Sequence, residues 1–222
     1  MNIEIKKVSK TYGKKSVLRD ISFRAQGGRC VGILGGNGCG KSTLLSILAG
    51  VQSCDSGEFL YDGKNLFDYP LQRSELIGYV PQGTPLIEEL NAYDNLLLWY
   101  DKKSLKEELD QGVLAMLGID KFLKTPVSKM SGGMKKRLSI GCAIAKRPPV
   151  LLLDEPMAAL DLSCKQTIIE YLSRHKERGG ILLLATHDVL ELELCDECYI
   201  IKNGTISPFL YEGDIEKLVK RL

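Results

Sequence analysis

Long hydrophobic runs, a strong charge of one sign and an even set of cysteines are all missing from this 222-residue chain. Its longest apolar stretches, such as those at 150–153 and 181–185, are far shorter than the roughly 20 residues that a membrane-spanning helix needs. The 30 Lys and Arg residues against 28 Asp and Glu leave a net charge of +2, which indicates no surface for nucleic acid. The first ten residues contain no apolar run, so we expect no secretory signal.

Seven cysteines without a secretory signal do not suggest a disulfide framework, and we expect a reduced, cytoplasmic protein. Cys195 and Cys198 have the spacing of a redox or metal-binding pair, but the chain lacks the second such pair that a metal site would use. Of the two histidines, His175 lies near a polar helix end, where we expect it to be solvated. The basic residues at 135–137 would strengthen the local positive field, although we expect most of them on the solvated face of a helix.

The pattern of apolar residues predicts an α/β fold. Alternation near the N-terminus predicts half-buried strands, and short, fully apolar runs alternating with helices predict a buried parallel sheet. The stretch 86–130 is helical in pattern, so we expect one domain over 1–222, with a helical subdomain at 86–130 inserted into a core that comprises 1–85, including an antiparallel β subdomain, and 131–222. The predicted elements are strands at 1–9, 16–25 and 29–35, a helix at 41–50 that ends on Gly50, a strand–turn–strand unit at 56–66, and a strand, a helix and a strand at 150–155, 164–178 and 180–187.

Residues 35–42, GGNGCGKS, fit the pattern G-x-x-x-x-G-K-[ST] between a predicted strand and a predicted helix, the context that a phosphate-binding loop needs. Glycines let the backbone point several N–H groups at one anion, and the helix N-terminus adds partial positive charge. Lys41 would bring a full charge to the β- and γ-phosphates, and Ser42 a hydroxyl to Mg²⁺. We therefore predict a P-loop NTPase fold whose nucleotide-binding loop consists of Gly35, Gly36, Asn37, Gly38, Cys39, Gly40, Lys41, Ser42 and Thr43.

The apolar strand at 149–156, PVLLLDEP, ends in two acidic residues. Asp154 lies at the C-terminal end of the strand, where α/β sheets place their ligands, and it suits Mg²⁺ binding through a water molecule. Glu155 follows it and can orient or deprotonate an attacking water. The same residues could simply end a strand in a turn, but the P-loop upstream favours the catalytic interpretation.

Further motifs follow one another along the chain: Tyr12, the loop 35–42, YVPQ ending at Gln82, MSGGM at 130–134, LLLDE at 151–155, AALD at 158–161, and THD containing His187. In this order they resemble the ATP-binding subunit of an ATP-binding-cassette (ABC) transporter, over essentially the whole chain. The resemblance implies that Tyr12 stacks on adenine, Gln82 meets Mg²⁺ and the attacking water, and His187 contacts the γ-phosphate. The implied cofactors are ATP and Mg²⁺; the implied catalytic groups are Lys41, Gln82, Glu155 and His187, and the implied metal site is Ser42, Gln82 and Asp154.

The resemblance also implies a role for the Ser-Gly-Gly turn at 131–133. In the family, two copies pack head to tail, and each ATP lies between the P-loop of one copy and this turn of the other. The hydroxyl of Ser131, the close approach that glycines permit and the positive end of the following helix all suit an anion. The residues implied in this contact are Ser131, Gly132, Gly133 and Met134, and those implied in a loop at the dimer interface are Ala159, Leu160 and Asp161.

The chain departs from the commonest family pattern at four positions. Met130 and Met134 replace Leu and Gln of the signature, and Gly36 and Leu162 stand where proline is usual. None of these changes removes a catalytic group. We expect phosphate binding to survive, with a less rigid loop at Gly36.

The resemblance implies a subunit that pairs with a second copy or a related ATPase subunit beneath a separate transmembrane permease, on the cytoplasmic face of the membrane. Such subunits receive the permease's coupling helix near Gln82 and the segment 83–96, and similarity within 131–161 favours an exporter; no nucleic-acid partner is expected. One alternative is a soluble ABC ATPase in DNA repair or protein assembly, although repair members usually carry coiled coils or zinc modules. Others are an ATPase that transmits force to a membrane complex and a cassette that binds ATP without hydrolysis, against which the intact catalytic groups argue.

Overall fold

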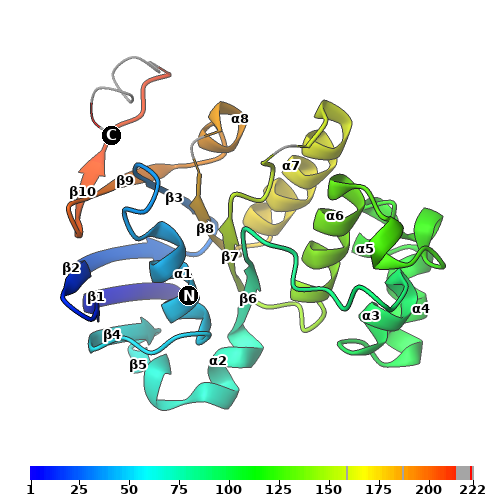
Figure 1. The fold of residues 1–222 in the computed structure, drawn as a ribbon, viewed down its shortest axis with the longest axis horizontal. Coiled ribbons are helices and arrows are strands. Elements are labelled where there is room, and N and C mark those ends of the chain that lie inside the picture. Colours follow the sequence, from blue (N-terminus) through cyan, green and yellow to red (C-terminus); the bar gives the residue numbers. More distant parts are fainter. Residues whose placement is uncertain (159, 187, 214–220, 222) are drawn as a thin grey trace.

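The computed structural model describes residues 1–158, 160–186, 188–213 and 221, and in these residues it contains a six-stranded and a four-stranded sheet (Figure 1). The strands of the larger sheet are β3 (Cys30–Leu34), β6 (Ile77–Val80), β7 (Val150–Asp154), β8 (Ile181–Ala185), β9 (Glu197–Lys202) and β10 (Thr205–Phe209). Their order is β10-β9-β3-β8-β7-β6, and all neighbours are parallel except β10 and β9. The predicted parallel core sheet is therefore confirmed.

The central strands of this sheet are buried along their whole length, as their apolar sequences predict. Successive residues point to opposite faces, so each strand contributes to two separate cores. Val150 and Leu152 of β7 belong to a core on one face, and Leu151 and Leu153 to a core on the other. The sheet thus joins two apolar layers.

The four-stranded sheet is antiparallel, and it covers the helix α1 (Lys41–Ala49). Its strands are β1 (Asn2–Tyr12), β2 (Lys15–Gln26), β4 (Ser56–Tyr61) and β5 (Lys64–Asn65). Leu44 and Leu48 of α1 are fully buried between the two sheets, in one core with Ile3 and Ile5 of β1. The helix ends as predicted at Gly50, which adopts the left-handed conformation with φ 88° and donates its N–H to the Ile47 carbonyl.

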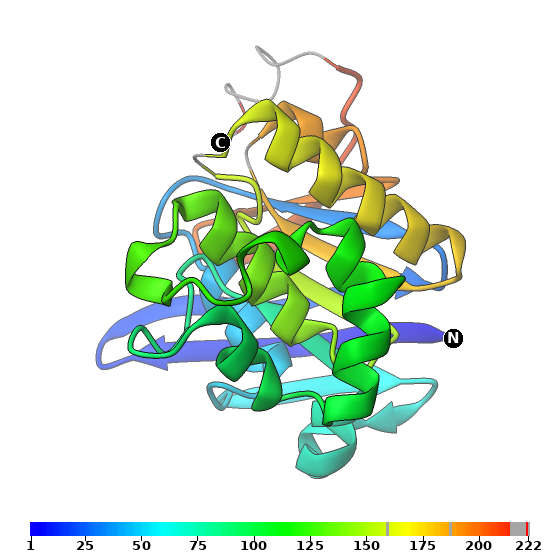
Figure 2. The ribbon, with the colours of Figure 1, turned by 90° about the vertical axis from the view of Figure 1, so that its right-hand side faces the viewer.

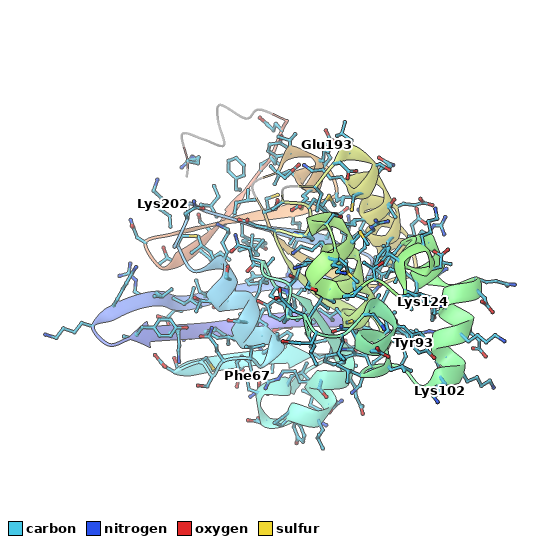
Figure 3. The ribbon with its side chains drawn as sticks, turned by 45° about the vertical axis from the view of Figure 1, so that its right-hand side comes forward. Phe67, Tyr93, Lys102, Lys124, Glu193 and Lys202 are labelled. Carbon is cyan, nitrogen blue, oxygen red and sulfur yellow. The ribbon has the colours of Figure 1, made fainter. Side chains whose placement is uncertain are left out.

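The other face of the large sheet carries most of the remaining helices, and Figures 1 and 2 show those within 92–177 grouped together. These are α3 (Ala92–Leu97), α4 (Lys102–Asp110), α5 (Val113–Met116), α6 (Gly132–Ala143), α7 (Leu162–Glu177) and α8 (Val189–Leu192), with 3₁₀ turns at Ile119–Phe122 and Val127–Lys129. A further helix, α2 (Pro70–Leu76), precedes β6, after a 3₁₀ turn at Leu66–Asp68. Figure 3 shows Phe67 beside the small sheet and Tyr93 among the helices, and each packs against the core on its own side.

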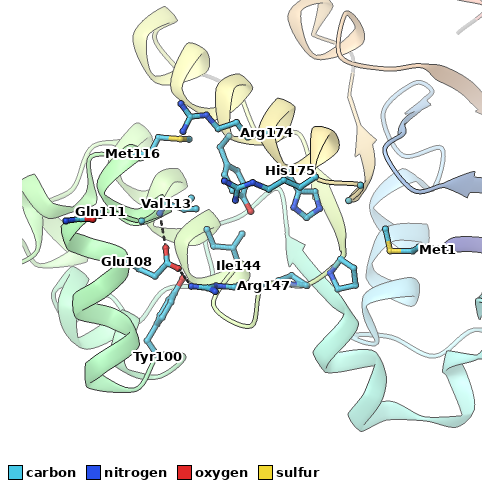
Figure 4. Close-up of a pocket in the computed structure, with 17 residues that line it drawn as sticks. Met1, Tyr100, Glu108, Gln111, Val113, Met116, Ile144, Arg147, Arg174 and His175 are labelled. Carbon is cyan, nitrogen blue, oxygen red and sulfur yellow. Dashed lines mark hydrogen bonds and ion pairs between the residues drawn. The ribbon is translucent and has the colours of Figure 1, made fainter.

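Glu108 connects three elements of the helical side (Figure 4). Its carboxylate accepts a hydrogen bond of 2.8 Å from the backbone N–H of Val113, at the start of α5, and forms an ion pair of 2.9 Å with Arg147, which precedes β7. The hydroxyl of Tyr100 donates to the Gly141 carbonyl of α6 at 2.9 Å. The segment 86–130 is therefore attached to α6 and to the α6–β7 loop by polar as well as apolar contacts.

His175 differs from the prediction of a solvated residue at a helix end. Its imidazole is half-buried beside Tyr171, at a ring-centroid distance of 6.3 Å, and burial lowers its pKa. The chain returns over the helix end at Gly180, where any added Cβ would collide with the ring. Because glycine leaves this space, the ring folds back onto the start of β8, and its Nε2 has no hydrogen-bond partner among the described residues.

No helix in the described part of the chain has both the length and the apolar character that crossing a membrane requires.

Candidate functional site

The loop between β3 and α1 closes around the side chain of its own lysine. The buried ammonium of Lys41 donates to the carbonyl of Gly35 at 2.7 Å and to that of Gly36 at 3.4 Å. Gly35 and Gly40 have φ values of 151° and 116°, in the region that favours glycine. A Cβ on Gly35 would lie 2.6 Å from the Ile201 carbonyl oxygen, and one on Gly40 would lie 2.8 Å from Leu18 Cδ2. Both ends of the loop therefore require glycine.

Asp154, the last residue of β7, lies against the first turn of α1. Its carboxylate is only 2% exposed and is hydrogen-bonded to the hydroxyl of Ser42. Burial is the largest influence and raises the pKa of Asp154, whereas Ser42 and the ammonium groups of Lys41 and Lys136 oppose that rise. The structure thus brings together the acid and the hydroxyl that were predicted to serve one metal ion.

Glu155 and Gln82 meet at the carboxyl ends of the parallel strands. Glu155 has a left-handed backbone conformation, with φ 47°, and its N–H donates to the Ala185 carbonyl of β8 at 2.9 Å. Gln82 follows β6, and its Nε2 donates to Glu155 Oε2 at 2.9 Å. A cavity of about 250 Å³ unites these side chains with the phosphate loop; it is lined by Asn37, Gly38, Lys41, Ser42, Gln82 and Glu155.

Oxygen donors around this cavity suit a small, hard cation. Ser42 offers a hydroxyl, Gln82 an amide oxygen and Asp154 a carboxylate, the donor types that Mg²⁺ prefers. A carboxylate as buried as that of Asp154 is costly to ionise unless positive charge lies near it. The residues present therefore fit Mg²⁺ held together with phosphate oxygens.

Tyr12 lies at the end of β1, exposed to solvent, with its hydroxyl donating to the side chain of Gln52. It pairs across the hairpin with Lys15 of β2. Lys15 in turn lines a hollow of about 560 Å³ together with Gly36, Asn37 and Gly38. The hairpin that carries Tyr12 therefore borders the phosphate loop, although Tyr12 does not itself line either cavity.

The Ser-Gly-Gly turn lies away from the cavity of its own chain. Ser131 caps α6 by accepting a hydrogen bond of 3.3 Å from the N–H of Met134. Ser131 and Gly132 are exposed, and a Cβ on Gly132 would meet open space. Figure 1 shows α1 and α6 on opposite sides of β6 and β7, so this turn does not reach the P-loop beside α1. Met130 is buried in the helical core, which explains how it can replace a leucine.

The loop after Glu155 is described only in part. Leu160 is half-buried and packs against the helical core. Asp161 caps α7 by accepting a hydrogen bond of 2.8 Å from the N–H of Cys164. Ala159 and His187, two of the predicted site residues, lie outside the described residues.

Lys136 is a buried residue that the sequence interpretation placed on a solvated helix face. Its side chain is 5% exposed, and its ammonium donates to the carbonyls of Pro81 at 3.1 Å and Gln82 at 3.2 Å. The prediction was wrong because a basic run on a helix does not reveal which of its members a distant loop will cover. Its spacing, one turn before the buried Ile140, is the only signal that could have identified it.

Glu191 in α8 is a second buried group that the sequence did not indicate. It is 1% exposed, and one carboxylate oxygen accepts a hydrogen bond of 2.8 Å from the N–H of Met157. Burial is the largest influence and raises the pKa of Glu191 to about 7, whereas the side chain of Thr186 opposes that rise. It therefore links the segment after Glu155 to the segment that follows β8.

Comparison with known families matches residues 18–158 to the family described as ABC transporter. Among curated proteins, the chain is 35% identical over 210 residues to the spermidine/putrescine import ATP-binding protein PotA of Mycoplasma mycoides subsp. mycoides SC, covering 92% of this chain and 60% of that protein. It is 33% identical to the linearmycin resistance ATP-binding protein LnrL of Bacillus subtilis, covering 91% of this chain and 67% of that protein. The chain thus spans about three fifths of the length of its PotA relative.

Among solved structures, the chain resembles the dimeric post-hydrolysis state of an ATP-binding cassette bound to ADP and Pi, with 26% identity and a TM-score of 0.82 over 94% of this chain and 99% of that one. It also resembles an ATP-binding subunit of an ABC transporter, with 27% identity and a TM-score of 0.84 over 100% of this chain and 95% of that one. The chain therefore belongs to the ABC transporter family and has the fold of that family's ATPase cassettes.

Proposed function

We propose that this chain binds and hydrolyses ATP, that two copies or two related cassettes close around two ATP molecules, and that the cycle drives a membrane transporter. The observation that carries the proposal is the small cavity in which Lys41 and Ser42 of the P-loop side face Gln82 and Glu155. These four side chains come from three separate segments, which follow the carboxyl ends of the parallel strands β3, β6 and β7. Phosphoryl transfer needs this combination of a charged cradle and a group that activates water.

In this proposal each side chain has a defined task. Lys41, which contacts the carbonyls of its own loop, would turn to the β- and γ-phosphates. Ser42, Gln82 and Asp154 would hold Mg²⁺, which when bound would withdraw charge from the phosphate oxygens. Glu155 would accept the proton of the attacking water, and its hydrogen bond with Gln82 would hold it in position.

We infer that the site takes a second cassette, because the exposed turn at Ser131 begins α6, which lies across β6 and β7 from α1 (Figure 1). A backbone N–H, a hydroxyl and a helix N-terminus together form an anion site that another copy could supply with phosphates. The similar structure with ADP and Pi is dimeric, which supports the same arrangement here.

Light scattering of the Glu155→Gln variant tests this proposal. Removing the base should leave ATP binding intact and block hydrolysis, so Mg-ATP should convert the monomer into a dimer that persists. Adding Ser131→Arg to this variant should abolish dimer formation, because a bulky charged side chain would occupy the phosphate position. A sample that binds ATP, remains monomeric and is indifferent to Ser131→Arg would contradict the composite site.

We further propose that a membrane-spanning partner docks on the groove beside Gln82 and so brings the chain to the cytoplasmic face of the membrane. The groove measures about 690 Å³ and extends from Ser42 to Pro85, Leu86 and Trp99. Trp99 is 58% exposed and Ile87 is 44% exposed, so apolar surface lies open next to a catalytic loop. A partner helix bound in this groove would contact Gln82, so a change in the position of Gln82 would alter that contact.

The direction of transport is proposed as export. The similarity within 131–161 supports this assignment, and the relative LnrL is named for resistance. The match to PotA, an import protein, favours polyamine uptake as the second candidate. An experiment with inside-out vesicles distinguishes export from polyamine uptake. The vesicles carry the chain with its permease and are preloaded with labelled spermidine. ATP-dependent release of spermidine, absent with Glu155→Gln, would contradict export.

A further inference from the structure

Lys136 connects two functional segments that are far apart in the sequence. It lies in α6, whose first turn is capped by Ser131, and its ammonium contacts the carbonyls of Pro81 and Gln82, which directly follow β6. The donor–acceptor distances are 3.1 and 3.2 Å. Through the side chain of Gln82 the contact continues to Glu155, at 2.9 Å. One buried cation therefore lies between the start of α6 and the proposed base.

Burying this cation is unfavourable in itself, and the surroundings show what compensates for it. Burial lowers the pKa of Lys136, and the carboxylates of Asp154, Glu191 and Glu155 oppose that effect. Two backbone carbonyls accept its hydrogen bonds, so the loop after β6 gains partners that its own strand cannot provide. Removing the ammonium would leave both carbonyls without this donor.

We propose that Lys136 is a positioning residue, which fixes the backbone at Pro81 and Gln82 to α6 so that the Gln82 side chain meets Glu155. The inference rests on the proposed roles of Gln82 and Glu155. Because α6 begins at the turn that would contact the neighbour's ATP, the same residue would make the placement of Gln82 depend on whether the neighbour's nucleotide is engaged. Nucleotide binding at one site of the pair would then affect the geometry of the other site through the Lys136 ammonium group.

Hydrogen exchange and steady-state kinetics of Lys136→Met test the inference. The variant should exchange the amide hydrogens of residues 82–84 and 86 faster without any nucleotide, because the loop loses its anchor. Its kcat for ATP hydrolysis should fall at least about tenfold, since a displaced Gln82 no longer holds the base. KM for ATP should stay within about twofold, because the P-loop is unchanged. The matched control is Lys135→Met on the same helix, which removes only an ion pair of 3.4 Å with Glu88.

A double-mutant cycle with Gln82→Ala distinguishes positioning from general damage. If Lys136 acts through the side chain of Gln82, Lys136→Met should change kcat less than about twofold once that side chain is absent. An equal loss of kcat in the wild-type and Gln82→Ala backgrounds would overturn the inference. So would the absence of any loss of kcat when Lys136→Met is made in the wild-type protein. Lys136→Gln, whose side chain is one bond shorter, replaces Lys136→Met if that protein does not fold. If Glu155→Gln leaves hydrolysis intact, the proposed site itself is wrong, and that outcome is independent of Lys136.

Discussion

The buried carboxyl group of Glu191 makes stability depend on pH. One of its oxygens accepts the Met157 N–H, the other is enclosed without a partner among the described residues, and Asp188 adds a nearby like charge. Lys165 and Lys136 face the carboxyl group from α7 and α6, and Cys195 lies against its backbone carbonyl. Burial has the largest effect, so the pKa rises from 4.5 to about 7 in the folded chain.

A folded-state pKa above the unfolded value means that the unfolded chain releases this proton first as the pH rises. The stability contributed by Glu191 is therefore complete below about pH 4.5 and is lost as the pH rises through about 7. Glu191→Gln, which resembles the protonated acid, should lack this loss. Relative to wild type, its free energy of unfolding should increase by on the order of 2 to 3 kcal/mol between pH 5 and pH 8.

Urea unfolding of both proteins at these two pH values measures the difference. Glu193→Gln is the matched control for the loss of one charge, since Glu193 is exposed two residues farther along the chain. A constant difference between Glu191→Gln and wild type at both pH values would show that Glu191 is not held in its protonated form.

At the scale of elements, short apolar runs and the glycines that end or separate them allowed much of the fold to be predicted. The strands β3, β7 and β8 are buried on both faces, and such strands have few polar residues to confuse the pattern. The helical stretch 86–130 was recognisable as helical, but it consists of short pieces. Asp101, for example, caps a new helix by accepting the N–H groups of Lys103 and Ser104. Such a cap can be predicted from the sequence once a helix is expected to start nearby.

The P-loop and Asp154 could be predicted because their contacts are local or occur at strand ends that a parallel sheet brings together. Lys136, Glu191 and His175 could not. Lys136 meets carbonyls more than 50 residues away, and Glu191 meets an N–H 34 residues away. Whether a charged side chain is buried depends on which distant backbone covers it, and periodicity along one helix does not contain that information.

At the scale of the whole molecule, the sheet separates two parts that the proposed reaction needs together. The P-loop opens α1 on one side of β6 and β7, whereas Ser131 opens α6 on the other (Figure 1). The carboxyl ends of β7 and β6 lie between them. The proposed catalytic residues Glu155 and Gln82 directly follow these two strands. Under the proposed function, a single chain would therefore present two different half-sites on its surface, and a head-to-tail pair would contain two complete sites.

This separation has a genetic consequence. Lys41→Ala damages one half-site and Ser131→Arg the other, so each variant alone should form only defective sites. In a mixed pair both defects fall on one site, and the other is built from the intact halves of the two chains. Mixing the inactive proteins in equal amounts should therefore restore up to about one quarter of the wild-type sites. ATP hydrolysis that appears only in the mixture would reveal two alleles complementing each other; a mixture as inactive as its components would contradict the divided site.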